Sequence, residues 1–362
     1  MPHCRPSVGF ATLSRDEDAI MNSERNRVTI SDVAKASGVS NSAVSYALNG
    51  KAGVSSDTRQ QVLAVAQRMG WRPNSAAKAL SDAATHSVGM ILTYAMSVLS
   101  VESYTTELMA GLTAELERKG YSLLIRSSSS HEYELTVLQE WIASGAVDAV
   151  LVLNVELNDP RIALLQSQHR IPALALCNPM FSQGLPALSS NESDAAHLII
   201  DYLHELGHTR IARVAGPERL GHTFIRDNAF MEEAAALGLQ YSCLHADYSP
   251  EDGLRCTKRL LSLPHAPTAI VYDNDVMALS ALKASNDMGI AVPEALSIVS
   301  WDDSFMCEVS VPSITALNRN VVGTGRLAAQ LILQLIEGKD VDSVSETDNE
   351  LVFRESSGPV HK

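Results

Sequence analysis

A run of polar side chains near the start of the sequence has the composition expected for reading nucleic acid. Asn41, Ser42, Ser45, Tyr46 and Asn49 fall on one face of a predicted helix. Their amide and hydroxyl groups can donate hydrogen bonds to base edges and phosphate oxygens, and accept them from base edges. A helix of this size is too small to do chemistry, so we expect its neighbours to place it in a DNA groove.

Two further helices are predicted to position this one. Apolar residues at helical spacing indicate a first helix over 30–37, and Ser40 lies where the second helix needs its N-cap. A third helix begins at Ser55 or Ser56 and continues to Met69. The alternative is an ordinary helical hairpin on a globular domain. The cap, the turn and the small residues together favour a helix-turn-helix unit instead.

A short segment over 74–82 follows this unit. Pro73 blocks continuation of the third helix and can begin a new one, and the alanines after it favour helix. Because so few residues are not stably helical alone in water, we expect a hinge helix that forms together with a partner chain and DNA. A plain flexible linker is the alternative.

This part of the sequence closely resembles the DNA-binding domain of the lactose-repressor (LacI/GalR) family. The matching residues are Val28-Thr29-Ile30-x-Asp32-Val33-Ala34, Gly38-Val39-Ser40, Val44-Ser45, Leu48-Asn49, Val54-Ser55, Thr58-Arg59 and Pro73-Asn74-x-x-Ala77-x-x-Leu80. The resemblance implies a helix-turn-helix domain over 28–73 that binds a palindromic operator as a homodimer.

The same resemblance assigns roles to individual residues. It makes Asn41, Ser42 and Tyr46 the base-reading side chains. It implies phosphate contacts from Thr29, Ser40, Ser45, Asn49, Ser55 and Asn74. Leu80 becomes an apolar wedge in the minor groove. The family often has arginine where this chain has Tyr46, so bidentate guanine readout is missing and the operator sequence is expected to differ.

Charge is distributed unevenly along the 362 residues, which are enough for two or three domains. The formal net charge is −14. Residues 22–80 nevertheless carry eight Lys/Arg against three Asp/Glu, so this segment is +5 and the rest is −19. A basic head can bind phosphates while an acidic body is repelled from the duplex.

Residues 1–27 are expected to form a disordered extension, with Met21 as the alternative start. They lack the apolar run of a signal peptide, and no apolar stretch of the chain approaches the eighteen or so residues of a membrane span. The five cysteines have no paired or metal-like spacing. A reduced, cytoplasmic protein is therefore expected.

From residue 86 onward, short Val/Ile/Leu-rich runs alternate with helical patterns. This alternation predicts an α/β fold, and the number of units predicts two doubly wound parallel-sheet lobes over 86–355, followed by a tail over 356–362. Ligands of such folds bind at the carboxyl ends of the strands, so the site should lie between the lobes.

This second region resembles the family's effector domain, which is similar to periplasmic sugar-binding proteins. Its landmarks include Glu205-Leu206-Gly207-His208-x-Arg210-Ile211-Ala212, Asn274-Asp275-x-Met277-Ala278 and Trp301-Asp302-Asp303. The resemblance implies that Arg226, Asn274 and Asp302 contact the ligand, with Tyr104 stacking on it in place of the usual aromatic residue. Such a set suits a sugar or related polyol, although departures at Cys177-Asn178 and Ser189-Ser190-Asn191 allow another small ligand.

A zinc-protease pattern, H-E-x-x-H, occurs at His204–His208. Gly207 should end the helix before the second histidine, so we expect no metal site there. The sequence offers no nucleophile or metal constellation of an enzyme, so we expect no cofactor and no enzyme activity. The sequence thus predicts a cytoplasmic, dimeric transcriptional regulator, most simply a repressor, controlled by a small ligand. The alternative is a periplasmic-type solute-binding protein without a DNA role, which leaves residues 28–80 unexplained.

Overall fold

The computed structural model describes residues 28–72, 84–93, 102–128, 130–347 and 349–360. The chain divides into two compact units, Met1–Asp82 and Ala83–Lys362. The predicted extension over 1–27 and the predicted hinge, with Asn74 and Leu80, lie outside the described residues.

The first unit is a three-helix bundle. Its helices are α2 (Ile30–Ser37), α3 (Asn41–Leu48) and α4 (Ser56–Arg68). Val33, Val44 and Val62 are fully buried between them. Each helix begins at a hydroxyl N-cap, which satisfies an N–H group of the first turn that has no partner within the helix. All three predicted helices are confirmed.

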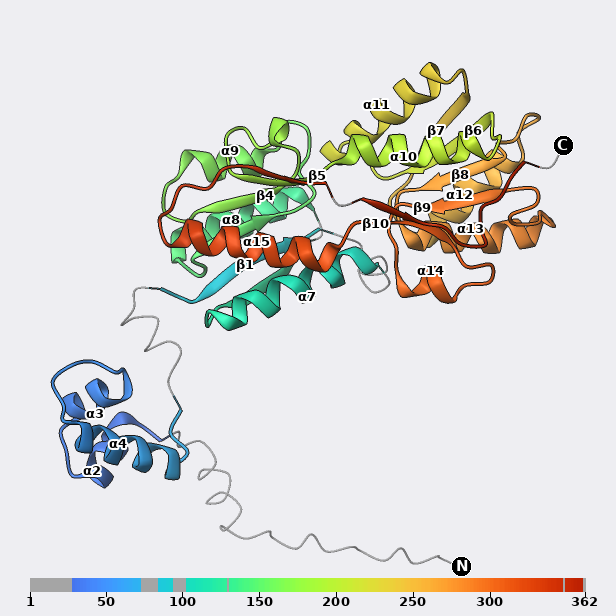
Figure 1. The fold of residues 1–362 in the computed structure, drawn as a ribbon. Coiled ribbons are helices and arrows are strands. Elements are labelled where there is room, and N and C mark those ends of the chain that lie inside the picture. The colour runs from blue at the N-terminus through green and yellow to red at the C-terminus, as the bar shows by residue number, and fades with distance from the viewer. Residues whose placement is uncertain (1–27, 73–83, 94–101, 129, 348, 361–362) are drawn as a thin grey trace, which may run out of the picture. The chain divides into compact units, whose positions relative to one another are not determined.

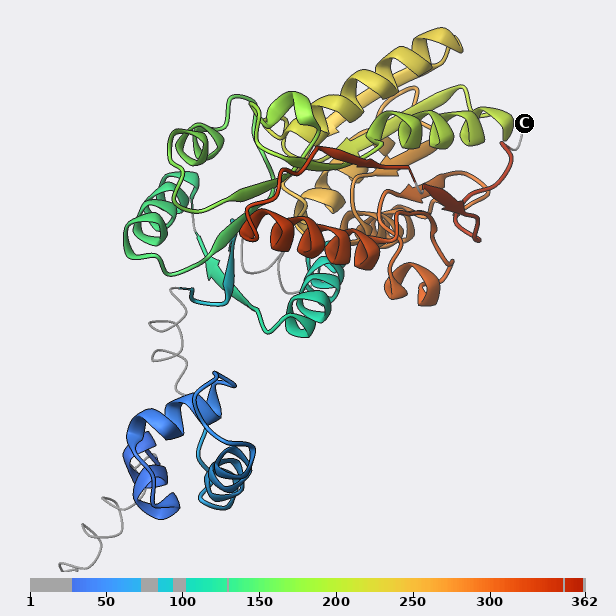
Figure 2. The same cartoon turned by 60° about the vertical axis from the view of Figure 1, so that its left-hand side comes forward.

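The second unit contains two lobes, each with a six-stranded sheet covered by helices on both faces (Figures 1 and 2). The first sheet has the order β11-β5-β4-β3-β1-β2 and all its pairs are parallel. Its strands are β1 (Ser87–Leu92), β2 (Ser122–Ser127), β3 (Ala149–Val152), β4 (Ala173–Leu176), β5 (Ala187–Ser190) and β11 (Val344–Glu346). The first lobe also contains the helices α7 (Ser103–Arg118), α8 (His131–Ser144), α9 (Pro160–Ser167) and α15 (Val321–Ile336), and the short η1 (Pro179–Phe181).

The second sheet has the order β12-β10-β9-β8-β6-β7, and only its β10–β12 pair is antiparallel among the described strands. Its strands are β6 (Arg210–Ala215), β7 (Gln240–His245), β8 (Ala269–Tyr272), β9 (Ser297–Ser300), β10 (Thr315–Asn318) and β12 (Glu350–Val352). Its helices are α10 (Glu192–Glu205), α11 (Gly221–Ala236), α12 (Pro250–Leu261), α13 (Asp275–Met288) and α14 (Phe305–Val309). The prediction of two parallel-sheet lobes is confirmed.

Four apolar layers hold the helices on the sheets. Helices α7 and α15 cover one face of the first sheet and α8 and α9 the other, while α10 and α11 face α12 and α13 across the second sheet. Glycines let α7 and α15 approach closely: a Cβ on Gly111 would meet the backbone of Val322, and one on Gly325 would meet the backbone of Leu108. The chain therefore returns to the first lobe through a tightly packed helix.

The lobes are joined by crossings after β5, β10 and β11, so each lobe is built from separate parts of the sequence. They also touch directly. Glu156 of the first lobe forms an antiparallel bridge with Leu220 of the second, and Arg219 Nε donates to Glu156 Oε1 at 2.5 Å. None of the described helices has the length and apolar character needed to cross a membrane.

Candidate nucleic-acid interface and ligand pocket

Helix α3 presents a polar face to solvent. Asn41, Ser42, Tyr46 and Asn49 are exposed, and Ser45 is half-buried. Tyr46 is the largest of them, with 44% of its surface exposed, and its ring lies against Gly53 in the loop that follows. The side chains singled out from the sequence therefore remain available for contact with DNA.

Three other residues that are predicted to contact phosphates are the N-caps of the three helices. Thr29 and Ser55 accept from the amides of Asp32 and Thr58, at 3.3 and 3.2 Å. Ser40 Oγ accepts from Ala43 N at 3.2 Å. Helix N-termini attract anions because their free N–H groups point outward and the helix dipole is positive there. The arrangement is suited to phosphate binding.

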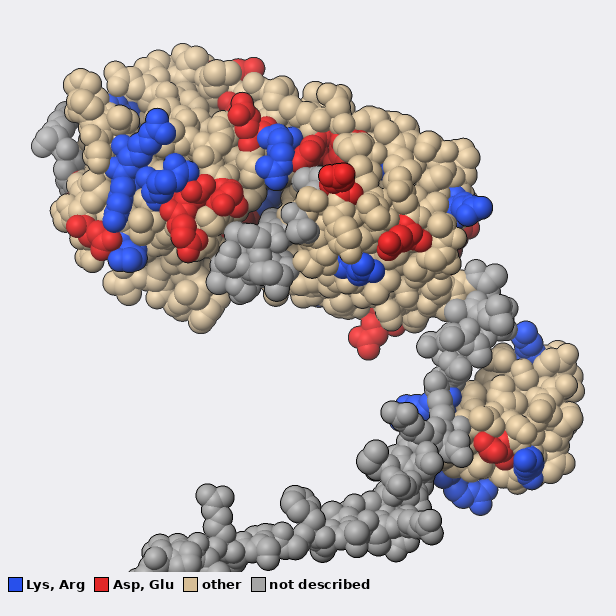
Figure 3. Space-filling model, turned by 180° about the vertical axis from the view of Figure 1, so that it is seen from behind, with Lys and Arg blue, Asp and Glu red and all other residues tan. Residues whose placement is uncertain are grey.

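The described part of the first unit carries a net positive charge, which favours binding to the negatively charged phosphates of DNA. Residues 28–72 contain five Lys/Arg and two Asp. Figure 3 shows basic side chains spread over the visible face of the unit, whereas acidic and basic groups are mixed on the larger unit. A net positive charge together with an exposed polar helix is typical of a DNA-binding module.

A pocket lies between the two lobes of the larger unit, where the carboxyl ends of the strands meet. It encloses ≈ 1010 Å³, counting the space open to solvent at its mouth. The first lobe contributes apolar and neutral polar residues, among them Leu153, Asn154, Leu176, Asn178 and Ser189. The second lobe contributes most of the charge.

All four predicted ligand residues line this pocket: Arg226, Asn274, Asp302 and Tyr104. Two of them already have strong partners. Arg226 is 4% exposed, donates from Nε to Glu192 at 2.5 Å, and stacks its guanidinium 4.0 Å above the ring of Trp301. Asp302 is bound by the guanidinium of Arg319. Arg226 and Asp302, which the resemblance implies as ligand contacts, therefore also belong to a fixed ionic network.

Asn274 and Tyr104 are likewise held in place. Asn274 caps α13, because its Oδ1 accepts from Met277 N at 2.9 Å, and its Nδ2 donates to Tyr248 O at 3.1 Å. One N–H of its amide is left for a ligand. Tyr104 lies with its ring 5.3 Å from the guanidinium carbon of Arg319, and burial raises the pKa of its hydroxyl to about 12.

Glu192 occupies the centre of the ionic network. It lies at the start of α10, where the chain crosses from one lobe to the other, and its Oε1 is 3.7 Å from Arg319 Nη1. Burial alone would raise its pKa, but Arg226 and Arg319 lower it to about 2. Glu192 is thus an ionised bridge between two arginines of the second lobe.

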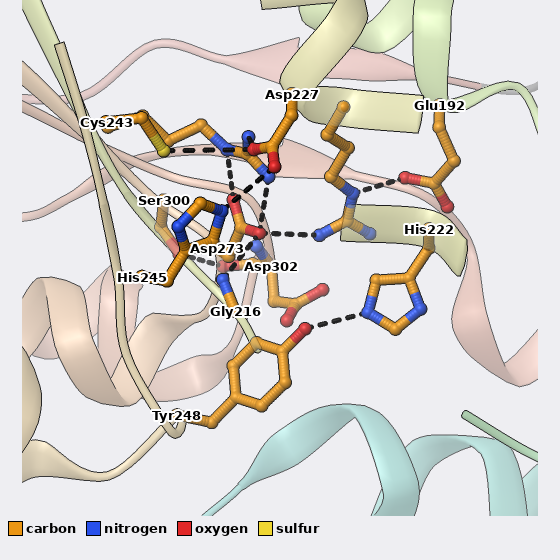
Figure 4. A network of polar contacts seen from close by, with 12 residues as sticks. Glu192, Gly216, His222, Asp227, Cys243, His245, Tyr248, Asp273, Ser300 and Asp302 are labelled. Carbon is orange, nitrogen blue, oxygen red and sulfur yellow. Dashed lines mark hydrogen bonds and ion pairs between the residues drawn. The ribbon is translucent and has the colours of Figure 1, made fainter. Parts of the chain in front are cut away.

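Asp273 is the second buried carboxylate, and Figure 4 shows how it is satisfied. Arg213, whose side chain is fully buried, donates from Nε and Nη2 to the two Asp273 oxygens at 2.6 and 2.7 Å. The backbone of Gly216 donates at 3.0 Å, and Arg226 lies 3.5 Å away. Burial would raise the pKa of Asp273, but these arginines hold it well below its usual value.

Two further titratable groups on the pocket wall have strongly shifted pKa values, which leave His222 neutral and Glu102 close to half-ionised at pH 7. Burial, helped by the charge of Arg226, lowers the pKa of His222 to about 3, and its Nε2 lies 2.7 Å from Tyr248 Oη (Figure 4). Glu102 is 7% exposed, and burial followed by repulsion from Asp302 raises its pKa to about 7.

The zinc-protease pattern does not form a site. Helix α10 ends at Glu205, before His208, which is 2% exposed and bonds through its ring nitrogens to Thr268 and Ser297 at 2.8 and 3.1 Å. His204 is exposed on the helix. The expectation that these histidines do not share a metal is in keeping with this geometry.

Comparison with known proteins agrees with a DNA-binding unit followed by a ligand-binding unit. The model described as "Bacterial regulatory proteins, lacI family" matches residues 29–74, and that described as "Periplasmic binding protein-like domain" matches residues 200–357. The transcriptional repressor PurR of Haemophilus influenzae is 31% identical over 336 residues, which cover 91% of this chain and 98% of the relative. The chain belongs to the lacI family.

Two solved structures of this family are similar over almost the whole chain. The lac repressor dimer bound to operator and the anti-inducer ONPF is 25% identical, with a TM-score of 0.80, over 92% of this chain and 100% of that one. A complex of the regulator CelR with cellobiose is 26% identical, with a TM-score of 0.68, over 91% and 100%. This lacI-family member is therefore a DNA-binding transcriptional regulator with an effector domain, and its relatives are regulators and not enzymes.

Sequence reasoning missed half of the charged pocket of this lacI-family member. Five polar residues line the pocket but were not predicted to contact a ligand: Glu192, Arg319, His222, Tyr248 and Asp273. A signal for two of them was present. Glu192 lies two residues after the end of β5 and Arg319 lies one residue after the end of β10, at the carboxyl ends of strands where ligands of parallel sheets bind. The strands β5 and β10 were not predicted, so the rule could not be applied to them.

Proposed function

We propose that this protein is a ligand-controlled repressor whose effector is a small, neutral, hydroxyl-rich molecule such as a sugar. The observation that carries the proposal is that both arginines on the described pocket wall, and three of its carboxylates, have an opposite charge beside them; Glu102, whose pKa is raised to about 7, is the exception. Arg226 and Arg319 share Glu192, Asp302 binds Arg319, and Asp273 binds Arg213.

This pairing disfavours a charged effector. An anion would have to displace a buried carboxylate from an arginine, which leaves that carboxylate uncompensated at a cost of about 3–5 kcal/mol. A cationic ligand would have to displace an arginine from its carboxylate, which would leave the buried arginine without a counter-charge. A neutral polyol exchanges hydrogen bonds with water for hydrogen bonds with these groups, without breaking an ion pair.

Free hydrogen-bonding groups remain for such a ligand. Within the described residues, the buried Nε–H of Arg319 has no hydrogen-bond partner, and one Nδ2–H of Asn274 is unused. Hydroxyl oxygens of a sugar would accept from both, while the Tyr104 ring provides an apolar surface. The cellobiose complex of CelR supports this ligand class.

On the DNA side, we propose that Asn41, Ser42 and Tyr46 contact bases. The hydroxyl groups of Thr29, Ser40, Ser45 and Ser55, and the amides of Asn49 and Asn74, would contact phosphates, with Leu80 as the minor-groove wedge. The exposure of the α3 face and the helix N-caps support these roles. A homodimer on a palindrome follows from the single recognition helix, because one helix reads one half-site. A protein of this kind acts on cytoplasmic DNA.

The effector proposal is tested by thermal unfolding of the full chain with neutral mono- and disaccharides and with the phosphorylated form of each. We expect a neutral sugar to raise Tm and its phosphorylated form to have no effect. The neutral hit should also change the affinity for palindromes upstream of neighbouring genes, because effector and DNA affinities are linked. Stabilisation by phosphorylated sugars alone would contradict the proposal.

Two variants separate the two surfaces. Arg226→Ala should abolish the ligand response and leave DNA binding intact. Leu80→Ala should weaken binding to the specific palindrome far more than binding to random DNA. Unchanged ligand affinity in the first variant, or equal losses on both DNAs in the second, would refute the corresponding assignment.

A further inference from the structure

A cluster of three metal-ligating side chains lies outside the ligand pocket, between the edge strand β7 and helix α11. His245 Nε2 lies 2.9 Å from Asp227 Oδ2, and Cys243 Sγ lies 3.8 Å from Asp227 Oδ1 (Figure 4). The candidate ligand atoms all lie within 4.8 Å of one another. In the part of the chain that the structure describes, no other set of three such residues is gathered in this way.

We propose that Asp227, Cys243 and His245 bind a zinc ion in the second lobe. A thiolate, an imidazole and a carboxylate are the ligands that Zn²⁺ prefers, at bond lengths of about 2.0–2.3 Å. Tetrahedral geometry at those lengths separates neighbouring ligand atoms by roughly 3.3–3.8 Å. The spacing in the cluster therefore needs only small side-chain adjustments.

The backbone already presents the three groups to one point. Cys243 and His245 are two residues apart on β7, so their side chains leave the strand on the same side, toward α11. Asp227 faces them from α11. The side chains of Asp227 and His245 are 26% and 32% exposed. Zinc can thus enter from solvent, and water can fill the fourth position.

Arg213 positions the carboxylate without blocking it. Its Nη1 donates to Asp227 Oδ1 at 2.5 Å, and the same guanidinium is held by Asp273. This leaves Asp227 Oδ2, at present the hydrogen-bond partner of His245, as the oxygen for the metal. Carboxylate ligands are commonly oriented by a hydrogen bond of this kind to their second oxygen.

Binding balances in charge and protons. Zn²⁺ replaces the thiol proton of Cys243, which is released to solvent, and binds Oδ2 of Asp227. The proton that His245 Nε2 now donates to Asp227 moves through solvent to Nδ1 of the same ring, so that the Nε2 lone pair of the neutral imidazole can bind the metal. No oxidant or reductant is required. The Asp227–Oδ2···Nε2–His245 hydrogen bond is lost and is replaced by two metal bonds.

The test uses the full-length protein, stripped of metal and titrated with Co²⁺ as a spectroscopic probe, then with Zn²⁺. We expect one Co²⁺ per chain with a thiolate-to-metal absorption band, and displacement of the Co²⁺ by Zn²⁺. Cys243→Ser should abolish the band, and His245→Ala should weaken binding at least tenfold. Zinc should raise the Tm of the wild-type protein and leave that of Cys243→Ser unchanged.

Two matched variants exclude other sites. Cys177→Ser removes a cysteine of the first lobe, and His204→Ala removes the exposed histidine of the H-E-x-x-H pattern. Both should bind Co²⁺ as the wild type does. If His245→Ala does not fold, as judged by its metal-free melting curve, His245→Gln replaces it. Absence of the thiolate band in the wild type, or a band that survives Cys243→Ser, would overturn the proposal.

Discussion

Replacing Glu102 by glutamine is expected to stabilise the protein relative to the wild type at alkaline pH and to change its stability little at acid pH. Glu102 caps α7, where its carboxylate accepts from Thr105 N at 3.0 Å, and it lies in the pocket near Asp302 and Asp275. Glutamine has the same shape and keeps an acceptor oxygen for the cap. The substitution therefore removes the negative charge and little else.

The magnitude follows from the raised pKa. Burial, and then repulsion from Asp302, raises the pKa of Glu102 from 4.5 to about 7. One decade of proton affinity corresponds to about 1.4 kcal/mol, so ionising this carboxyl destabilises the folded state by about 3 kcal/mol. Because the pKa is raised on folding, this group's favourable contribution is complete below pH 4.5 and is lost as the pH rises to about 7.

The assay is urea unfolding of the wild type and of Glu102→Gln at pH 5 and pH 8, followed by tryptophan fluorescence of the effector domain. The variant should be more stable by about 3 kcal/mol at pH 8 and by less than about 1 kcal/mol at pH 5. Glu117→Gln, on the exposed side of the same helix, is the matched control and should change stability by less than about 0.5 kcal/mol at either pH.

The decisive quantity is how the difference in unfolding free energy between Glu102→Gln and the wild type changes with pH. An equal gain at pH 5 and pH 8 would mean that the substitution acts through packing or the cap and not through charge. No gain at pH 8 would mean that the carboxylate is compensated when ionised. Either result would refute the reasoning.

Three further predictions concern packing and capping. Ser40→Ala removes the N-cap of the recognition helix and should destabilise it by about 1 kcal/mol, seen as faster amide exchange in α3 and weaker DNA binding; unchanged exchange would contradict this. Gly111→Ala places a methyl group against the backbone of Val322 and should lower stability by about 1–3 kcal/mol in urea unfolding, whereas a neutral result would show that the helices can separate freely. Tyr272→Phe removes the buried hydrogen bond to Thr257 at 2.8 Å and should cost about 1 kcal/mol, while a stabilised variant would argue against that bond.

The strongest predictions from sequence were those governed by local rules. Caps at Ser40 and Ser55 and the apolar spacing around Val33 and Val44 depend on residues within one or two turns, and the structure confirms the helices that they delimit. Buried strands such as β1 were recognisable because a parallel strand covered on both faces is continuously apolar.

Some strands without a continuous apolar run were not predicted from the sequence. The edge strand β7, with the sequence QYSCLH, is buried only in part and has no continuous apolar run. It nevertheless supplies Cys243 and His245, so the metal-like cluster could not be anticipated. Its third member, Asp227, comes from α11, and a pairing between a helix and an edge strand leaves no trace in residue spacing.

By itself, the sequence determined that this protein has a helix-turn-helix unit, two parallel-sheet lobes and a set of pocket residues that includes Arg226 and Asp302. The helix-turn-helix unit and the lobes depend on periodicity, caps and continuously apolar strands, whereas the pocket residues came from the resemblance to the family. Only the tertiary structure decided that these two residues are already paired, Arg226 with Glu192 and Asp302 with Arg319. The reason is physical: charge pairing depends on distances of a few ångströms between residues far apart in the chain, and those distances exist only after the lobes have folded.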